Sequence, residues 1–353
     1  MHAHLMPDAL PSNDDPGFPK VEPAQTADGG NARLLISGQM RFTARDAFFD
    51  PEARLAEAAA SGVDVEVVSP FPPLLNYTLP PLAGRELCRA VNRYIGDLHQ
   101  RWPDHFYGFG TVPLQDPDLA AAELGELRAL GLHGVEIASN IVGTPLGDER
   151  FLGFFQEAER LGLPVFVHAM PNPSDNGKLP FTAVGSYGMA AEIGMAAASL
   201  VASGTVENCP NLRLALSHGA GGFPLMLPRA QFFWGGTWDE APPDPAVPPS
   251  GPPGVDRPAV SPIALARRFY YDALVFDRRA LRYLIDLVGP TRLIVGTDFP
   301  AMNRQQPVDG SLRSLDIPQS TVEDITWNNC FRFLAVPAPA VPAPAPASGA
   351  APA

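Results

Sequence analysis

Residues 164–169 read PVFVHA, a short apolar run that ends in a histidine. A run of this length, rich in branched and aromatic side chains, predicts a strand that is buried on both faces. It follows an amphipathic segment at 149–162, ERFLGFFQEAERLG, whose final glycine is typical of a helix C-terminus. A helix followed by a buried strand is the repeating unit of an α/β fold.

The same unit recurs on both sides of this stretch. Further buried strands are expected at VDVEVVS (63–69), FYGFGTV (106–112), HGVEIAS (133–139), LRLALSH (212–218), FYYDALV (269–275) and RLIVGTD (292–298), and helices at 51–61, 82–102 and 119–131. With the stub of a first strand at residues 1–4 the count reaches eight, which predicts a (β/α)₈ TIM barrel. An open, doubly wound sheet is the alternative, but the sequence lacks the glycine-rich turn that such folds carry after the first strand.

The predicted first strand is short, because only Met1 precedes His2. A barrel strand needs about five or six residues, and each buried backbone group without a partner costs on the order of 1–3 kcal/mol. We therefore expect a truncated first strand, a gap in the barrel floor, and a natural chain that begins a few residues upstream.

The barrel is expected to form one domain that covers residues 1–335. Proline-rich sequence at 239–262 predicts a surface loop within this domain, and the Pro/Ala-rich sequence at 336–353 predicts a disordered tail. A further long loop is expected at 6–50, where Asn-Asp-Asp-Pro-Gly and Asp-Gly-Gly are turn signals.

Composition limits the classes of partner and location. The chain has 353 residues, 46% of them hydrophobic, which is enough for a full core. Its formal net charge of −13 opposes electrostatic binding to nucleic acid or to an anionic membrane. The sequence shows neither a signal peptide nor an apolar run of about 18 residues, so we expect a cytoplasmic protein. The cysteines, Cys88, Cys209 and Cys330, lie too far apart in sequence to indicate a disulfide framework or a thiolate zinc site.

Four of the seven histidines fall where such a barrel carries its active site. His168 and His218 end predicted strands, as does Asp298, and His2 and His4 lie where the first strand ends. The C-terminal ends of the strands form the catalytic face of a (β/α)₈ barrel. The other histidines, expected to have structural roles on a helix or at strand starts, are His99, His105 and His133.

The spacing of these residues predicts a metal site. His2 and His4 point to the same side of a strand and can direct two imidazoles at one ion. His168 adds a third nitrogen from across the barrel, and Asp298 adds an anionic oxygen. Three neutral imidazoles and one carboxylate suit one zinc, or a similar divalent metal, per chain, with a position left open for water.

His218 has two candidate roles, as a further ligand in a binuclear site or as a general acid/base beside one metal. A binuclear site usually contains a bridging anion, often a carboxylated lysine at a strand end, and neither Lys20 nor Lys178 ends a strand. One metal, with His218 as the acid/base group, is therefore favoured. The glycines at 219, 221 and 222 allow the backbone to approach a substrate closely.

In this order the motifs resemble the aminocarboxymuconate-semialdehyde decarboxylase family of the amidohydrolase superfamily. The resemblance is carried by HAH (2–4), AFFDPEARLAEAAASGVDVEVVS (47–69), VFVHA (165–169), LRLALSHGAGGFP (212–224), FYYDALVFD (269–277) and LIVGTDFP (293–300), and it covers nearly all of residues 1–335. It implies a (β/α)₈ metalloenzyme with one zinc held by His2, His4, His168 and Asp298. It also implies a water on the metal that His218 activates.

The resemblance also implies how a carboxylate substrate is held. Arg229 stands eleven residues after His218, where these decarboxylases carry an arginine that crosses a dimer interface to the substrate. This match implies a homodimer. Arg41 and Arg45 lie near the place of a second substrate arginine, in the first loop.

Two positions near the predicted site depart from the family pattern. Phe276 stands where close decarboxylases have histidine, so that the motif reads LVFD instead of LVHD. Ala169-Met170 follows the third predicted ligand, where the family often has Pro-Trp. These differences concern the substrate and leave the predicted metal ligands unchanged.

Two reaction types fit the predicted site. The first is non-oxidative decarboxylation of a small unsaturated or aromatic carboxylate, in which the metal chelates the substrate and His218 moves the proton. The second is metal-dependent hydrolysis of an ester, amide or lactone with the same ligands. The first is favoured, and arginines at the mouth of the site would bind the carboxylate in bidentate pairs.

Overall fold

The computed structural model describes residues 1–175, 179–235 and 259–339. Eight parallel strands form one sheet in the order β1-β5-β6-β7-β10-β11-β12-β13. Their bounds are β1 (Ala3–Leu5), β5 (Glu66–Pro70), β6 (Phe106–Gly110), β7 (Gly134–Ala138), β10 (Val165–His168), β11 (Leu214–Leu216), β12 (Tyr270–Asp272) and β13 (Leu293–Ile294). Every strand expected from the sequence is present and parallel to its neighbours, which confirms the (β/α)₈ architecture.

The sheet closes where the chain after β13 runs beside β1. Ala3 pairs in parallel with Phe299, and the amide of His4 donates to the carbonyl of Phe299 at 2.7 Å. The amides of Thr297 and Asp298 donate to the carbonyl of His2 at 3.2 and 2.8 Å. This seam joins the segments that carry His2, His4 and Asp298, so barrel closure itself brings these side chains together.

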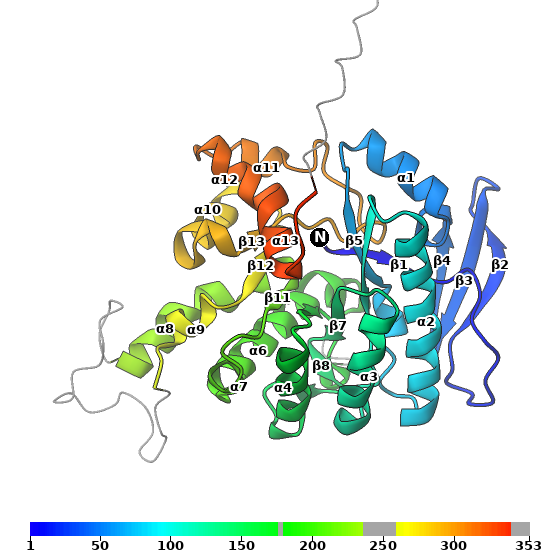
Figure 1. Ribbon diagram of the computed structural model, residues 1–353, viewed down its shortest axis with the longest axis horizontal. Helices are drawn as coiled ribbons and strands as arrows, with labels where there is room; N and C mark the ends of the chain where they lie inside the picture. The colour runs from blue at the N-terminus through cyan, green and yellow to red at the C-terminus, as the bar shows by residue number, and fades with distance from the viewer. Residues whose placement is uncertain (176–178, 236–258, 340–353) are drawn as a thin grey trace, which may run out of the picture.

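Helices surround the strands on the outside of the barrel (Figure 1). The longer ones are α1 (Pro51–Ala60), α2 (Pro81–Arg101), α3 (Pro117–Ala129), α4 (Leu152–Leu161), α6 (Met189–Ala202), α8 (Phe223–Gly235) and α10 (Arg278–Val288). Local sequence sets their ends. Asp50 and Asp116 accept hydrogen bonds from the first-turn amides of α1 and α3, and Gly162 ends α4 with a left-handed φ of 62°.

Residues 6–50 do not form the irregular loop that was expected. They contain a three-stranded antiparallel sheet of β2 (Lys20–Gln25), β3 (Asn31–Ser37) and β4 (Met40–Arg45), seen at the edge of the molecule in Figure 1. The Asp-Gly-Gly signal lies in the turn between β2 and β3. Leu35 and Ala44 are fully buried, so this sheet packs its inner face on the barrel.

The barrel floor is filled by side chains, and the gap that was expected there is absent from the described structure. The floor cluster contains Met1, Val67, Phe109, Phe166, Ala215, Tyr270, Ile294, Phe331 and Phe333. The last two come from α13 (Asn329–Leu334), and Phe333 lies 5.1 Å from the ring of Tyr270. The first strand is short, with three residues. That the natural chain begins upstream stays a prediction.

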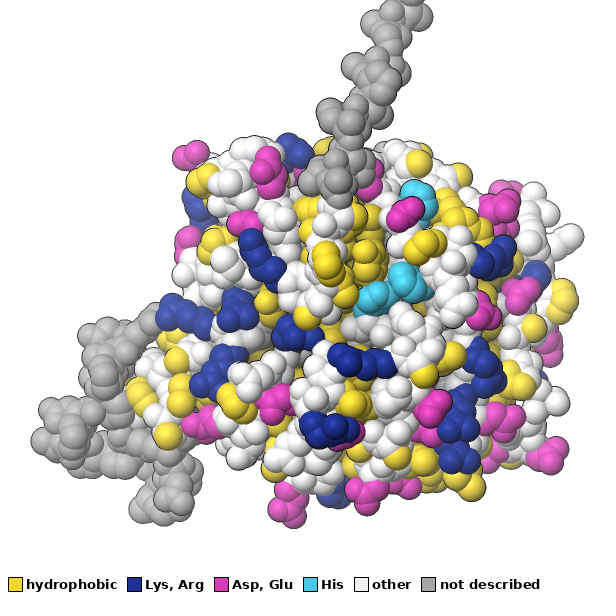
Figure 2. Space-filling view, in the orientation of Figure 1, with side chains coloured by type: hydrophobic (Ala, Val, Ile, Leu, Met, Phe, Trp, Pro, Cys, Tyr) yellow, Lys and Arg dark blue, Asp and Glu magenta, His cyan; other side chains and the backbone are white. Residues whose placement is uncertain are grey.

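The two proline-rich segments predicted at 239–262 and 336–353 lie mostly outside the described residues. By length and composition alone, Val184–Ala202 is apolar enough to cross a membrane, with a mean hydropathy of 1.2. In the fold this segment contains α6, which packs Ile193, Ala197 and Leu200 into the core. Figure 2 shows acidic and basic side chains spread over the visible face of the molecule instead of gathered into one basic patch.

Candidate metal centre

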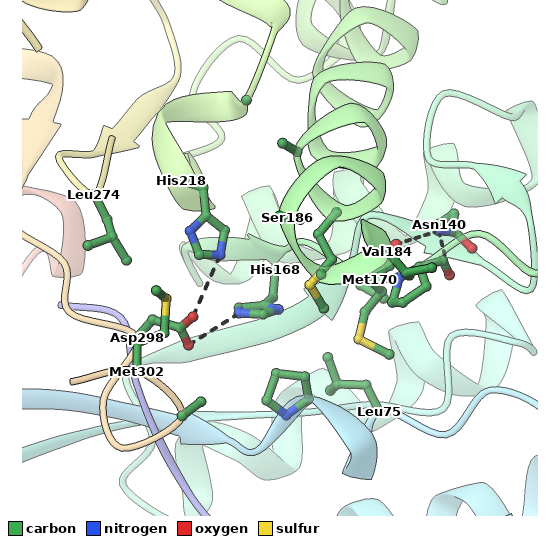
Figure 3. A pocket seen from close by; sticks show the side chains of 18 of the residues that line it. Leu75, Asn140, His168, Met170, Val184, Ser186, His218, Leu274, Asp298 and Met302 are labelled. Atoms are coloured by element: carbon green, nitrogen blue, oxygen red, sulfur yellow. Dashed lines mark hydrogen bonds and ion pairs between the residues drawn. The ribbon is translucent and has the colours of Figure 1, made fainter. Parts of the chain in front are cut away.

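The predicted metal ligands meet at the C-terminal end of the barrel strands. The Nε2 atoms of His2, His4 and His168 lie 3.5, 3.0 and 3.9 Å from Asp298 Oδ1. His218 Nε2 lies 3.8 Å from the other oxygen of Asp298. Figure 3 shows His168 and His218 both directed at this carboxylate. The structure thus brings together the four predicted metal ligands and the predicted acid/base residue, His218.

Hydrogen bonds at the opposite ring nitrogens orient the three ligand histidines. His2 Nδ1 lies 2.5 Å from Asp272 Oδ2, His4 Nδ1 lies 3.0 Å from the carbonyl of Pro70, and His168 Nδ1 lies 2.8 Å from the carbonyl of Ala169. Each acceptor holds a proton on Nδ1 and directs the Nε2 lone pair inward.

The donor set fits a divalent metal. The Nε2 atoms of His2, His4 and His168 are buried and have no hydrogen-bond partner among the described residues. Burying a polar atom without a partner is unfavourable. An ion at their meeting point would satisfy all three nitrogens, together with an oxygen of Asp298.

The charges of the site favour a cation. Burial lowers the pKa of His168 and of His218 to about 4, so both rings are neutral near pH 7. Burial also acts to lower the pKa of His2, but the hydrogen bond with Asp272 and the nearby carboxylate of Asp298 outweigh it and raise this pKa to about 10. Burial alone would raise the pKa of Asp298, yet its contacts with the histidines hold it well below the usual value. The site therefore offers ionised carboxylates beside the neutral imidazoles of His168 and His218, whereas His2 must release its extra proton before its Nε2 can bind a metal.

Asp272 is a site residue that the sequence reasoning missed. It ends β12 and is fully buried, and besides contacting His2 it accepts a hydrogen bond from the amide of Gly219 at 2.9 Å. It therefore links a metal ligand to the turn that carries His218. Its position at the C-terminal end of a strand, which it shares with the other site residues, was the available signal.

Glu136 is a second buried carboxyl group that was not anticipated. It lies on β7, its Oε1 is 3.9 Å from His4 Nδ1, and neither oxygen has a hydrogen-bond partner among the described residues. Burial raises its pKa well above the usual value. Burial thus acts in favour of the neutral form of this carboxyl group in the metal-free fold.

Backbone strain is concentrated at the site. His2, His218 and Asp298 have φ values of 61°, 50° and 54°, in the left-handed region that residues other than glycine rarely adopt. Such strain persists where the surrounding structure enforces it, and it is found at functional sites. By contrast, His99 and His133 pack against each other with ring centroids 4.6 Å apart, away from the metal ligands.

A large cavity opens beside the metal ligands. Its volume is about 1450 Å³, and His168, His218 and Asp298 line it together with mostly apolar side chains. Apolar walls with a few polar groups at one end are characteristic of small-molecule sites.

The three arginines expected to bind substrate do not line this cavity in the described chain. Arg41 is exposed, Arg45 forms an ion pair with Glu57, and Arg229 lies exposed on α8, 4.9 Å from the ring centre of Phe233. Their roles in substrate binding stay predictions. For Arg229, the prediction requires a second copy of the chain.

Comparisons with known proteins agree with this geometry. Residues 1–336 match the family model described as amidohydrolase. The chain is 26% identical to the 2-amino-3-carboxymuconate-6-semialdehyde decarboxylase of Dictyostelium discoideum, over 95% of this chain and 91% of that protein.

Two solved structures share the fold. The 5-carboxyvanillate decarboxylase from Sphingomonas paucimobilis is 24% identical, with a TM-score of 0.73 over 82% of this chain and 84% of that one. A dihydroxybenzoic acid decarboxylase from Polaromonas, solved with bound manganese and 2-nitroresorcinol, is 21% identical, with a TM-score of 0.69 over 82% and 88%.

Proposed function

The chain belongs to the amidohydrolase family, and we propose that it is a metal-dependent, non-oxidative decarboxylase of a small unsaturated or aromatic carboxylate. The observation that carries this proposal is the convergence of three unpartnered imidazole nitrogens on Asp298 at one end of an apolar cavity. The decarboxylases that resemble this chain over most of its length support the reaction type.

His2, His4, His168 and Asp298 would hold one divalent metal, which we assign as zinc. When bound, the ion supplies Lewis-acid chemistry by polarising oxygen atoms of the substrate. An imidazole-rich set with one carboxylate suits zinc. The manganese in the related Polaromonas structure makes manganese the alternative.

We assign to His218 the proton transfer that the reaction requires. When the bond to the carboxyl carbon breaks, CO₂ leaves and the electron pair stays on the substrate carbon, which must then take up a proton. The side chain of His218 is 17% exposed and lines the cavity, with Nε2 directed toward Asp298. Burial lowers the pKa of this imidazole to about 4, so the resting ring is neutral and would hold a proton only in transit between the substrate and the carbon.

We also propose that two copies of the chain form a homodimer, in which Arg229 of one copy binds the substrate carboxylate held by the other. The support is the surface around this arginine, where Leu225, Met226 and Phe233 are exposed apolar side chains on α8. Exposed apolar patches of this kind are typical of protein interfaces.

Product analysis tests the reaction type. Protein loaded with zinc or with manganese is incubated with aromatic carboxylates, such as 2,6-dihydroxybenzoate, and separately with aryl esters and lactones. We expect CO₂ from a carboxylate, and we expect His218→Ala to lose this activity while keeping its metal. Acid release from esters or lactones without CO₂ from any carboxylate would show a hydrolase and overturn the proposal.

A further inference from the structure

We propose that the substrate of this site carries an uncharged, apolar substituent that extends well beyond the ring or chain bearing its carboxylate. This inference rests on the proposed function for the carboxylate end of the substrate. The walls of the cavity beyond the metal ligands indicate the chemistry of the other end of the substrate.

The cavity is much larger than its metal-binding end. At about 1450 Å³ it exceeds the roughly 300–1,000 Å³ of typical small-molecule pockets. His168, His218 and Asp298 lie at one side of the view in Figure 3, and the lining continues away from them past Leu75 and Met170. A single-ring carboxylate bound at the metal ligands would leave this extension to water.

The walls of the extension are apolar. Its lining includes Leu75, Val142, Met170, Val184 and Met189. Removing alkyl or aryl surface from water against such walls is favourable, in proportion to the area buried. The methionines can adjust to irregular shapes.

The cavity offers few charged groups to bind a polar substituent, although the Tyr77 hydroxyl in its lining has no hydrogen-bond partner among the described residues. Asn140 lines the extension, but its amide already donates to the carbonyl of Met170 at 3.2 Å and to Glu192 at 3.1 Å. Among the described lining residues the one Lys or Arg is Arg279, whose side chain is 87% exposed and pairs with Asp277 at 3.0 Å. These walls therefore disfavour a phosphate, a nucleotide or a second carboxylate in the extension.

Both places where the sequence departs from the family pattern contribute a side chain to the wall of this cavity. Met170 and Phe276 are lining residues. Phe276 is 69% exposed and has a φ of 57°, so a large apolar side chain is presented to solvent at the lining of the site. Contact with the outer part of an apolar substituent would remove this ring from water.

A homologous series of substrates tests the inference. We would measure kcat/KM for CO₂ release from 2,6-dihydroxybenzoates with 4-alkyl groups from methyl to heptyl, and the Kd of the matching 5-alkylresorcinols by calorimetry. Both quantities should improve about two- to fourfold with each added methylene over the first several, as expected for burial of CH₂ groups. The gain should then level off at the end of the cavity.

Variants locate the effect. Val184→Trp and Met170→Trp should each reduce the heptyl-to-methyl ratio of kcat/KM by at least about tenfold, since the indole occupies the space of the alkyl chain. Leu82→Trp is the matched control, because Leu82 is 65% exposed on α2 and does not line the cavity. Thermal melting and metal content of each variant identify any that fail to fold.

Each outcome decides the inference. Values of kcat/KM and Kd that do not change along the series in the parent protein would overturn it, as would a ratio reduced equally by Leu82→Trp. If the resorcinols bind more tightly with chain length while no carboxylate releases CO₂, the apolar extension stands and the decarboxylase proposal fails. If both tryptophan variants are unfolded, the chain-length dependence of the parent decides.

Discussion

At the scale of single residues, the candidate metal site depends on hydrogen-bond acceptors that orient its histidine side chains. His2, His4 and His168 present Nε2 to a common point because Asp272 and two backbone carbonyls occupy their Nδ1 atoms. Of these acceptors, Asp272 alone is a side chain and can be replaced. It is therefore the most direct test of how the ligands are oriented.

Asp272→Asn should weaken metal binding about 10- to 100-fold, the usual effect of losing an acceptor behind a ligand histidine. The amide cannot supply the negative charge that stabilises His2, and it can present an N–H to the ring. Competition with a chelator measures the affinity. Asp277→Asn, at an exposed helix cap five residues on, is the control, and equal affinities in both variants would contradict the assignment.

Metal binding should release protons in a pH-dependent way. The pKa of His2 is raised from 6.5 to about 10 in the metal-free fold, so this ring carries a proton until the pH rises through that value. Binding at pH 8 should displace about one proton from Nε2, and the number should fall toward zero above pH 10. Calorimetry in buffers of different ionisation enthalpy counts the protons, and no release at pH 8 would be inconsistent with a protonated His2.

The same shift affects the stability of the metal-free protein. Because the folded-state pKa of His2 is raised, its contribution to the free energy of unfolding is fully present below pH 6.5 and is lost as pH rises toward 10. His168 and His218, with pKa values lowered to about 4, act in the opposite direction. Their contribution is present above pH 6.5 and is lost as pH falls toward 4.

At the scale of elements, the barrel seam is held by an arginine on α1. Arg54 is fully buried and donates to the carbonyls of His4 at 2.8 Å and Phe299 at 3.3 Å. Its Nε also donates to Glu66 on β5 at 2.7 Å. One guanidinium thus connects β1, β5 and the segment that carries Asp298.

Arg54→Met should lower the free energy of unfolding by about 3–5 kcal/mol, because it removes one member of a buried ionic group and leaves carbonyl groups without donors. It should also weaken metal binding, since the two segments that carry His4 and Asp298 lose a shared hydrogen-bond donor. Urea unfolding and chelator competition measure the two effects.

Arg160→Met removes an exposed ion pair with Glu157 and should leave the free energy of unfolding nearly unchanged. Arg54→Lys should recover part of the loss in metal affinity. A large loss of stability in Arg54→Met with unchanged metal affinity would show that the barrel seam does not support the metal site.

At the scale of the whole molecule, the proposed homodimer makes a prediction that a monomer does not. His218→Ala and Arg229→Ala should each be inactive, the second with a normal metal content. In a random mixture, half of the dimers are hybrids, and each hybrid contains one intact site, so roughly a quarter of the parent activity should return. No recovery in a mixture shown to contain hybrid dimers would assign Arg229 to a surface role.

The sequence alone determined the order of the eight barrel strands and the residues that meet at the candidate metal centre. Buried apolar runs and helix caps are local signals, and in any (β/α)₈ barrel the C-terminal strand ends meet on one face. His2, His4, His168, His218 and Asp298 could therefore be placed together before any distance was known.

The tertiary structure decided the features that depend on contacts between distant residues. The pairing of His2 with Asp272 spans 270 positions, and no local pattern encodes it. The floor packing of α13, the seam around Arg54 and the shape of the apolar cavity arise in the same way. The small sheet of β2–β4 was missed because turn signals alone do not distinguish a hairpin from a loop, a difference that packing against the barrel decides.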